Sequence, residues 1–341
     1  GLCIITAGFK ETGKEGAEAE KQLLEKVREY GMRCVGPNCL GVVNTHPDIR
    51  MDGCFAESLP ERGNIGFVSQ SGALGGGILN ILKDLNLGFA QFISIGNQAD
   101  VNAETALEYW ENEPDVEQIL LYMESIQNPA NFRKLASRIT KKKPILALKA
   151  GRSAAGASAA SSHTGSLAGA DKAAAALLHQ SGVIREFSLQ NLFETAKVFA
   201  NCPIPKGDRV AIITNSGGPG IMATDAVCEY GMQMAKISDA TKEKLRSFLP
   251  SAASVKNPID MIASAPIEHY KQTLETVIAD ENVDMIITIY LPFLGLKDID
   301  VAKALMEIKA EHPEKPVIGV FMTKNEFFTK LSDMKVNMPF F

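Results

Sequence analysis

Short apolar runs alternate with amphipathic stretches along almost the whole chain, and this alternation limits the fold more than any other feature. Each apolar run has the length of a strand buried on both faces, and the stretches between the runs have helical periodicity, as in residues 15–31. Strand–helix alternation of this kind predicts parallel sheets built from βαβ units. We therefore expect an α/β fold, with strands within residues 2–7, 64–70, 89–96, 117–125, 143–150, 209–216, 284–293 and 315–323.

Charge and cysteine content exclude several classes of protein. The 341 residues carry a formal net charge of −5 at pH 7, so no basic field attracts nucleic acid or an anionic membrane. The six cysteines are scattered without a CxxC pair, and no histidines have metal-ligand spacing, which indicates reduced thiols rather than disulfides or zinc. No apolar run has the length of a membrane-spanning helix, and no charged-then-apolar leader opens the chain. These features predict a cytoplasmic protein without a metal site of its own.

Two segments have the composition of domain boundaries. Residues 48–64 are polar and aperiodic, and residues 201–209 hold two prolines and a glycine before a new strand. They predict a partial unit over residues 1–57, a middle unit over 61–200 and a last unit over 206–341. Because the chain begins and ends within an element, we expect the first and last units to be truncated.

The second and third units open alike, with a strand, a Ser-Gly pair and a glycine-rich helix start. The pairs are Ser71-Gly72 and Ser216-Gly217. The first N–H groups of a helix lie at the positive end of its dipole without intrahelical partners, so such a turn can bind an anion. Neither turn matches the GxGxxG, GxxxxGK[ST] or GxSxG pattern. Tight packing of strand against helix and phosphate binding are therefore both open interpretations.

His163 lies in a segment, residues 151–169, that consists almost entirely of glycine, alanine and serine. This composition is typical of a flexible linker, which is one interpretation. A histidine that accepts a phosphoryl group needs space at one ring nitrogen and an acceptor at the other, and small neighbours provide the space. Glu124 is the best-placed acceptor, because it follows an apolar strand and ligand sites in open parallel sheets lie beyond the carboxyl ends of strands. The alternative for Glu124 is a solvated charge at a strand end.

Together these features resemble the nucleoside-diphosphate-forming acyl-CoA synthetases and, more distantly, the α subunit of succinyl-CoA synthetase. The most specific stretches are GPNCLGVVNT (36–45) and the His163 segment with its flanks (151–171), and the resemblance covers essentially the whole chain. Further matching stretches are ITAGFKETGKEG (5–16), GNIGFVSQSGALG (63–75), ILLYMESI (119–126), NSGGPGIMATDA (215–226) and NPIDM (257–261). The resemblance implies a partial Rossmann-like CoA-binding unit followed by two flavodoxin-like parallel-sheet domains.

The family converts an acyl-CoA, a nucleoside diphosphate and phosphate into a carboxylic acid, CoA and a nucleoside triphosphate, reversibly. Phosphate displaces CoA to give an acyl phosphate, and the phosphoryl group then passes to a loop histidine and on to an ATP-grasp domain. By this resemblance, His163 is the phosphorylated residue and Glu124 orients its ring. The resemblance also implies that phosphate is held by Ser69, Ser71 and Gly72 and by Ser216, Gly217 and Gly218, and that CoA is bound by Gly8, Phe9, Lys10 and Asn38.

The family's ATP-grasp domain and most of its CoA-binding domain have no counterpart in these 341 residues. The resemblance therefore implies that the nucleotide and its Mg²⁺ bind to an ATP-grasp domain or subunit outside this sequence, in an oligomeric assembly. We expect no turnover by this polypeptide alone. One alternative is a catalytically silent scaffold that senses CoA or acyl-CoA for a protein acetyltransferase, which need not keep the histidine. Another is an unrelated flavodoxin-like binding protein in which residues 151–169 are a linker.

Overall fold

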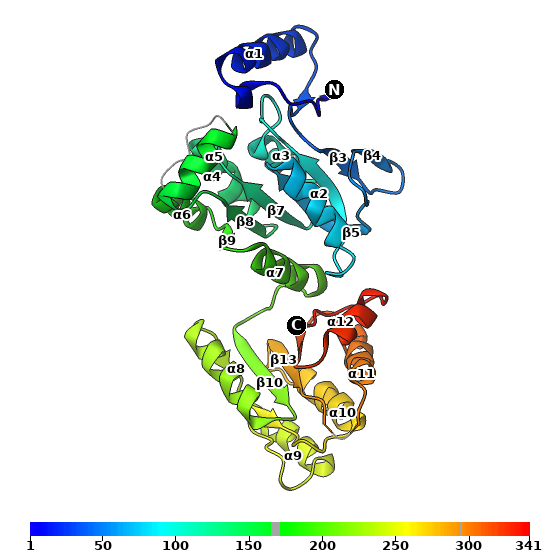
Figure 1. Ribbon diagram of the computed structural model, residues 1–341. Coiled ribbons are helices and arrows are strands. Elements are labelled where there is room, and N and C mark those ends of the chain that lie inside the picture. Colours follow the sequence, from blue (N-terminus) through cyan, green and yellow to red (C-terminus); the bar gives the residue numbers. More distant parts are fainter. Residues whose placement is uncertain (165–170, 294) are drawn as a thin grey trace. The chain divides into compact units, whose positions relative to one another are not determined.

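The computed structural model describes residues 1–164, 171–293 and 295–341, with the backbone alone for residues 160–164. These residues form two compact units, Gly1–Ala196 and Lys197–Phe341, each with its own sheet (Figure 1). The first unit thus combines the predicted unit 1–57 with nearly all of the predicted unit 61–200, up to Ala196.

The first unit is built around a seven-stranded sheet of order β4-β3-β6-β5-β7-β8-β9. The strands from β6 to β9 are parallel, and their order is the flavodoxin-like order 2-1-3-4-5, as predicted. The strands are β3 (Gly41–Asn44), β4 (Met51–Cys54), β5 (Arg62–Ser69), β6 (Phe89–Ser94), β7 (Gln118–Met123), β8 (Ile145–Lys149) and β9 (Ile184–Glu186). A separate parallel pair joins β1 (Leu2–Cys3) to β2 (Cys34–Val35).

Residues 48–64, expected to be irregular, contain β4 and the start of β5. Strand β4 lies at the edge of the sheet and pairs antiparallel with β3. Strand β3 in turn pairs antiparallel with β6. Apart from Cys54, which is partly covered, the residues of β4 are exposed. An edge strand of this kind needs no apolar periodicity, so the composition of the segment could not reveal it.

Helices cover both faces of this sheet. The helical segments are η1 (Lys10–Thr12), α1 (Lys14–Glu29), α2 (Gly72–Ile81), α3 (Ala103–Trp110), α4 (Pro129–Ile139), α5 (Ala154–Thr164), α6 (Asp171–Gln180) and α7 (Leu189–Asn201). On one face, Phe67 of β5 packs against Phe92 of β6 and Phe193 of α7. On the other face, Trp110 of α3 is fully buried and donates a hydrogen bond from Nε1 to Gln91 Oε1 at 2.8 Å.

The His163 segment differs from the loop expected there, because residues Ala154–Thr164 form helix α5. Five of the eleven residues of this helix are alanine, the residue with the highest helix propensity, so a composition typical of a linker also supports a helix. The backbone of α5 passes close to η1. His163 lies in the last turn of α5, and residues 165–169 lie outside the described part of the chain.

The second unit has a parallel sheet of order β11-β10-β13-β14, with β12 also paired to β10. Its strands are β10 (Arg209–Thr214), β11 (Gln233–Met234), β12 (Ile259–Asp260), β13 (Met285–Tyr290) and β14 (Val317–Phe321). Its helices are α8 (Gly217–Glu229), α9 (Asp239–Phe248), α10 (Ile267–Ile278), α11 (Asp298–Glu311) and α12 (Asn325–Ser332). Phe340 forms a parallel bridge to Gly319 of β14, so the last described residues continue the flavodoxin-like strand order.

The second unit is expected to lose stability in acid through Asp284, which follows α10 and directly precedes β13. The guanidinium of Arg209 bonds this carboxylate twice at 2.8 Å and holds its pKa at about 2, below the ordinary 3.8. Because the folded-state pKa is depressed, the stabilisation is present above the unfolded pKa and is lost as the pH falls from about 4 to about 2. Thermal unfolding followed by circular dichroism should show this loss, and Asp284→Asn should flatten it. An equal acid loss in Asp284→Asn and in the control Asp225→Asn, which alters an exposed carboxylate, would contradict this assignment.

Candidate active site

The turn between β5 and α2 is held by the two serines that the sequence singled out. Ser69 is fully buried, and its hydroxyl donates to the carbonyl of Ser71 at 2.6 Å. Ser71 is the N-cap of α2, and its hydroxyl accepts a hydrogen bond from the N–H of Leu74 at 3.4 Å. An ideal Cβ on Gly72 would lie 3.3 Å from the backbone nitrogen of Leu40, so a larger residue would crowd this turn. The serines therefore shape the helix start, and the first N–H groups of α2 are available to an anion.

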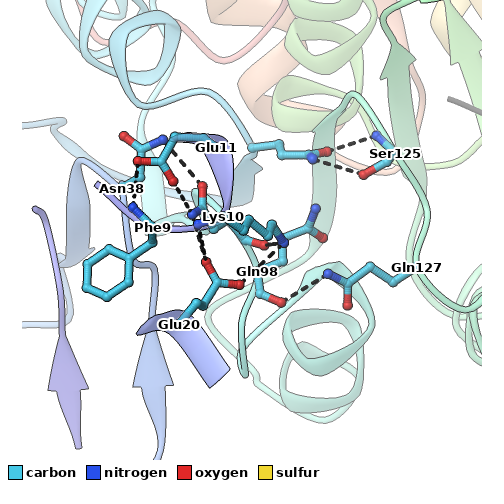
Figure 2. Close-up of polar contacts among 10 residues, drawn as sticks. Phe9, Lys10, Glu11, Glu20, Asn38, Gln98, Ser125 and Gln127 are labelled. Atoms are coloured by element: carbon cyan, nitrogen blue, oxygen red, sulfur yellow. Dashed lines mark hydrogen bonds and ion pairs between the residues drawn. The ribbon is translucent and has the colours of Figure 1, made fainter. Parts of the chain in front are cut away.

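Gln70, which the sequence analysis did not single out, joins this turn to the end of β7. Its Oε1 accepts hydrogen bonds from the backbone nitrogens of Glu124 at 2.7 Å and Ser125 at 3.0 Å. Its Nε2 donates to the hydroxyl of Ser125 at 3.0 Å, and Figure 2 shows these bonds around Ser125. All three residues are buried. We call this arrangement the Gln70 clamp; it fixes Glu124 beside the Ser69–Gly72 turn at the carboxyl edge of the sheet.

Glu124 is nearly buried, with 7% of its surface exposed, so it is not the solvated strand-end charge of the alternative interpretation. Burial raises the pKa of Tyr122, and the nearby charge of Glu124 raises it further. The neighbouring strand β8 ends at Lys149, a buried residue whose Nζ donates to the carbonyl of Ala150 at 2.5 Å. Burial lowers the pKa of Lys149, while the charges of Asp171 and Glu124 act in the opposite direction. Buried charges of both signs therefore gather where β7 and β8 end.

The four residues expected to bind CoA lie around one hydrogen-bonded network, of which Figure 2 labels Phe9, Lys10 and Asn38. Lys10 Nζ donates to the carbonyl of Asn97, and the side chain of Asn38 donates to Asn97 Oδ1 at 3.3 Å. The carboxylate of Glu11 accepts from the backbone nitrogens of Gly8 at 2.5 Å and Phe9 at 3.1 Å. Glycine is required at position 8 by a φ of 107°.

Three residues absent from the sequence prediction complete this network. Asn97 Nδ2 donates to Glu11 at 2.6 Å and to Glu20 at 2.8 Å, and Glu20 forms an ion pair with Lys10 at 3.7 Å. Burial raises the pKa of Glu11, but the hydrogen bonds from Asn97 and from the backbone of Gly8 and Phe9 outweigh it, so the net pKa is lowered. Residues from η1, α1 and the turn after β6 are thus tied together around the charged side chain of Lys10.

The turn between β10 and α8 shares two features with the β5–α2 turn, a hydroxyl that donates within the turn and a buried amide beside it. The hydroxyl of Thr214 donates to the carbonyl of Ser216 at 2.9 Å, as Ser69 does to Ser71. Asn215 is buried and takes the place of Gln70. It accepts from the backbone nitrogen of Leu291, just past β13, at 3.0 Å and donates to the carbonyl of Leu291 at 2.8 Å.

The two turns differ in the helix cap and in one charge. The Ser71 hydroxyl caps α2, whereas Ser216 makes no side-chain cap hydrogen bond at the start of α8. An ideal Cβ on Gly217 would lie 3.3 Å from the Oδ2 atom of Asp260, whose Oδ1 accepts from the backbone nitrogen of Ile262 at 2.9 Å. A carboxylate therefore lies at the start of α8, where phosphate was predicted at Ser216, Gly217 and Gly218. Because like charges repel, Asp260 weakens the binding of an anion at this helix end.

Asp260→Asn is therefore expected to raise the affinity of the α8 terminus for inorganic phosphate by about tenfold, since removal of a nearby like charge contributes roughly 1–2 kcal/mol. The measurement is a phosphate titration of the ¹⁵N-labelled chain, followed at the amide signals of Gly217 and Gly218. Asp225→Asn serves as the charge-matched control. Unchanged or weaker binding in Asp260→Asn would show that the carboxylate does not oppose the anion.

Among the residues that the structure describes, no group of three or more histidine, cysteine, aspartate or glutamate side chains could hold a metal ion. The same residues include no helix that is long and apolar enough to cross a membrane. All six cysteines are free thiols in this structure.

Comparison with protein families assigns both units to the CoA ligases. A succinyl-CoA ligase like flavodoxin domain matches residues 62–199, and a Ligase-CoA domain matches residues 210–330. The α subunit of acetate–CoA ligase [ADP-forming] II from Pyrococcus furiosus is 44% identical over 325 residues, which cover 94% of this chain and 70% of that subunit. The chain belongs to the family of ADP-forming acetate–CoA ligases, in agreement with the resemblance seen in its sequence.

Other relatives are longer than this chain. Acetate–CoA ligase [ADP-forming] I from Archaeoglobus fulgidus is 40% identical over 90% of the chain, which spans 44% of that protein. Among solved structures, acetyl-coenzyme A synthetase 1 from Ca. Korarchaeum cryptofilum in complex with phosphate and ADP superposes with a TM-score of 0.91 at 32% identity. That match covers 99% of this chain and 73% of the other.

Proposed function

We propose that this chain provides the CoA-dependent and phosphohistidine part of an acyl-CoA synthetase of the nucleoside-diphosphate-forming class, whose reversible reaction also makes a nucleoside triphosphate from an acyl-CoA. The observation that carries the proposal is the Gln70 clamp, which holds a buried carboxylate, Glu124, beside a helix start suited to phosphate. The family relationship adds the reaction type, because the named relatives are ADP-forming ligases.

The proposed reaction has three transfers. A phosphate oxygen attacks the carbonyl carbon of the acyl-CoA, the carbon–sulfur bond breaks, and CoA leaves as a thiol. A ring nitrogen of His163 then attacks the phosphorus of the acyl phosphate and releases the carboxylate. Finally, the phosphoryl group passes from His163 to a nucleoside diphosphate. Glu124 orients the imidazole in the second step, and Ser69, Ser71 and Gly72 hold the phosphate at the start of α2.

The remaining predicted residues have supporting roles. Ser216, Gly217 and Gly218 form a second phosphate-binding helix start at α8, and the network around Lys10 binds CoA through Gly8, Phe9, Lys10 and Asn38. A cationic side chain and a glycine-containing turn suit the phosphates of CoA. From the family resemblance, we place Mg²⁺ with the nucleotide on an ATP-grasp domain or subunit outside this sequence, in a cytoplasmic oligomer.

The proposal predicts no ATP synthesis by this chain alone and synthesis when a cognate ATP-grasp domain is added. The measurement is ATP production from acetyl-CoA, ADP and phosphate, with each component omitted in turn. Measurable CoA-dependent synthesis by the chain alone would contradict the proposed division of labour. A reconstituted mixture that binds CoA yet makes no ATP from any acyl-CoA tested would favour the CoA-sensing scaffold instead.

A further inference from the structure

Arg185 is a largely buried cation of the first unit, and the proposed reaction gives it no role. It lies in β9, where it pairs with Ala147 of β8. Ala147 belongs to the same hydrophobic cluster as Leu178 of α6, so Arg185 lies on the face of the sheet that α6 covers. Only 11% of its side chain is exposed, and its buried Nε atom has no hydrogen-bond partner among the described residues. Because a buried donor without a partner costs stability, stability alone does not explain an arginine at this position.

The guanidinium of Arg185 contacts the C-terminal flank of the His163 segment. Its Nη2 atom donates a hydrogen bond to Oδ1 of Asp171, and the two side chains form an ion pair. Asp171 is the first residue of α6, a helix that packs against β9. A carboxylate in this position also interacts favourably with the positive end of the helix dipole. The ion pair therefore fixes the start of α6 to β9.

The same guanidinium shares an aromatic ring with Arg152, in the N-terminal flank of the His163 segment. The Cζ atoms of Arg152 and Arg185 each lie 5.1 Å from the centroid of the Phe187 ring, so both guanidinium groups make cation–π contacts with it. Arg152 is followed by Ser153, whose hydroxyl accepts a hydrogen bond from the N–H of Gly156 at 3.0 Å in the first turn of α5. The Phe187 ring thus connects the start of α5 to the end of β9.

We propose that Arg185 is a positioning residue for phosphoryl transfer to and from His163, an inference that rests on the proposed function. Through Asp171 on one side and Phe187 with Arg152 on the other, it fixes both flanks of the His163 segment to a single strand, β9. Strand β9 pairs with β8, and β8 pairs with β7, the strand that ends just before Glu124. Both flanks are therefore held in register with the carboxylate that orients the imidazole in the proposed reaction.

The first measurement is the rate at which labelled Mg-ATP and a cognate ATP-grasp domain phosphorylate the 341-residue chain, at increasing concentrations of that domain. Arg185→Gln is expected to lower the maximal rate by about 10²-fold, the effect of misplacing a reacting group by about 1 Å. The half-saturating concentration of the ATP-grasp domain should stay within about twofold, because the complex still forms. A higher half-saturating concentration at an unchanged maximal rate would show that Arg185 docks the partner, and would overturn the proposal.

Arg138→Gln is the matched control for this measurement. Arg138 forms another arginine–carboxylate pair in the first unit, with bonds of 2.7 Å and 2.5 Å to the two carboxylate oxygens of Glu111. This pair joins α4 to the end of α3 and not to the His163 segment. Labelling of Arg138→Gln should proceed at the wild-type rate. Equal slowing in the two arginine variants would trace the effect to a general loss of stability and would reject the positioning role.

The ion pair itself is tested with Asp171→Asn and with the double variant. If Arg185 acts through Asp171, the second substitution removes little that the first has left, so the double variant should be at most about threefold slower than Arg185→Gln. Two effects that multiply independently would contradict action through this pair.

Phe187→Leu and Arg185→Lys keep the proposal testable if Arg185→Gln fails to fold by circular dichroism. The Phe187 side chain is 56% exposed, so its replacement leaves the core intact and should slow labelling about two- to fivefold, the size of an exposed cation–π contact. Arg185→Lys keeps the charge but loses the planar guanidinium, and should slow labelling about tenfold. Labelling of both variants at the wild-type rate would overturn the proposal.

The wild-type chain separates this inference from the proposed function. If the wild type and folded Arg185→Gln are labelled at the same rate, the proposed function stands and the positioning role of Arg185 is rejected. If an active ATP-grasp partner leaves the wild type unlabelled, the proposed function is rejected and this inference falls with it.

Discussion

Glu124→Gln is expected to slow phosphorylation of His163 by about 10²- to 10⁴-fold, because a neutral amide cannot fix the imidazole tautomer as a carboxylate does. The Gln70 clamp contacts the backbone nitrogen of Glu124 rather than its side chain, so this substitution leaves the clamp in place. The measurement is the rate of acid-labile label on the chain in the presence of a cognate ATP-grasp domain and labelled Mg-ATP.

Glu104→Gln is the matched control for this prediction. Glu104 is also buried, burial raises its pKa, and it accepts a hydrogen bond from the backbone nitrogen of Asn128 at 3.2 Å. Its substitution therefore tests the general effect of removing a buried carboxylate from the same unit. Labelling of Glu124→Gln at the wild-type rate would reject Glu124 as the orienting residue.

Gln70→Leu is expected to lower the free energy of unfolding of the first unit by about 2–4 kcal/mol. The substitution leaves two backbone N–H groups and the hydroxyl of Ser125 without their buried partner, and each unsatisfied group costs roughly 1–3 kcal/mol before water compensates part of the loss. Trp110, the single tryptophan, is buried in this unit, so urea unfolding followed by its fluorescence reports this unit selectively.

Asn215→Leu removes the equivalent clamp from the second unit and is the natural comparison. It should shift unfolding seen by circular dichroism while leaving the Trp110 transition in place. In folded Gln70→Leu, labelling of His163 should also slow by roughly 10²-fold, because displacement of a positioning group by about 1 Å has effects of this size. Loss of stability without a slower labelling rate would show that the clamp is structural only.

The positions of the strands along the sequence were predictable because a strand buried on both faces is a continuous apolar run, which β5, β7 and β10 all show. Their flavodoxin-like order was expected from the family resemblance alone. Polar elements gave no such signal, and β4 was missed for that reason. Helix α5 was missed because alanine-rich sequence is compatible with both a linker and a helix, and only the surrounding fold decides between them.

The location of part of the candidate site could be predicted from the sequence. Glu124 and the two Ser-Gly turns could be singled out because each follows an apolar strand. Glu124 and the Ser71-Gly72 turn then share one edge, since the carboxyl ends of parallel strands in one sheet lie together, while Ser216-Gly217 lies in the other sheet. Gln70 and Asn215 were missed because an amide beside a serine has no distinctive pattern; their roles depend on which strand lies next to them. The sequence did not show that the charge of Asp260 lies beside Gly217, because the pairing of β12 with β10 brings these two residues together.

The central claim is that His163 carries the phosphoryl group, and direct labelling tests it. The chain is mixed with a cognate ATP-grasp domain and labelled Mg-ATP, with His163→Ala as the control, and the label is tested for stability in base and loss in acid. The account predicts base-stable, acid-labile label on the wild type and none on His163→Ala. Absence of label from the wild type with an active partner, or equal label on both chains, would contradict it.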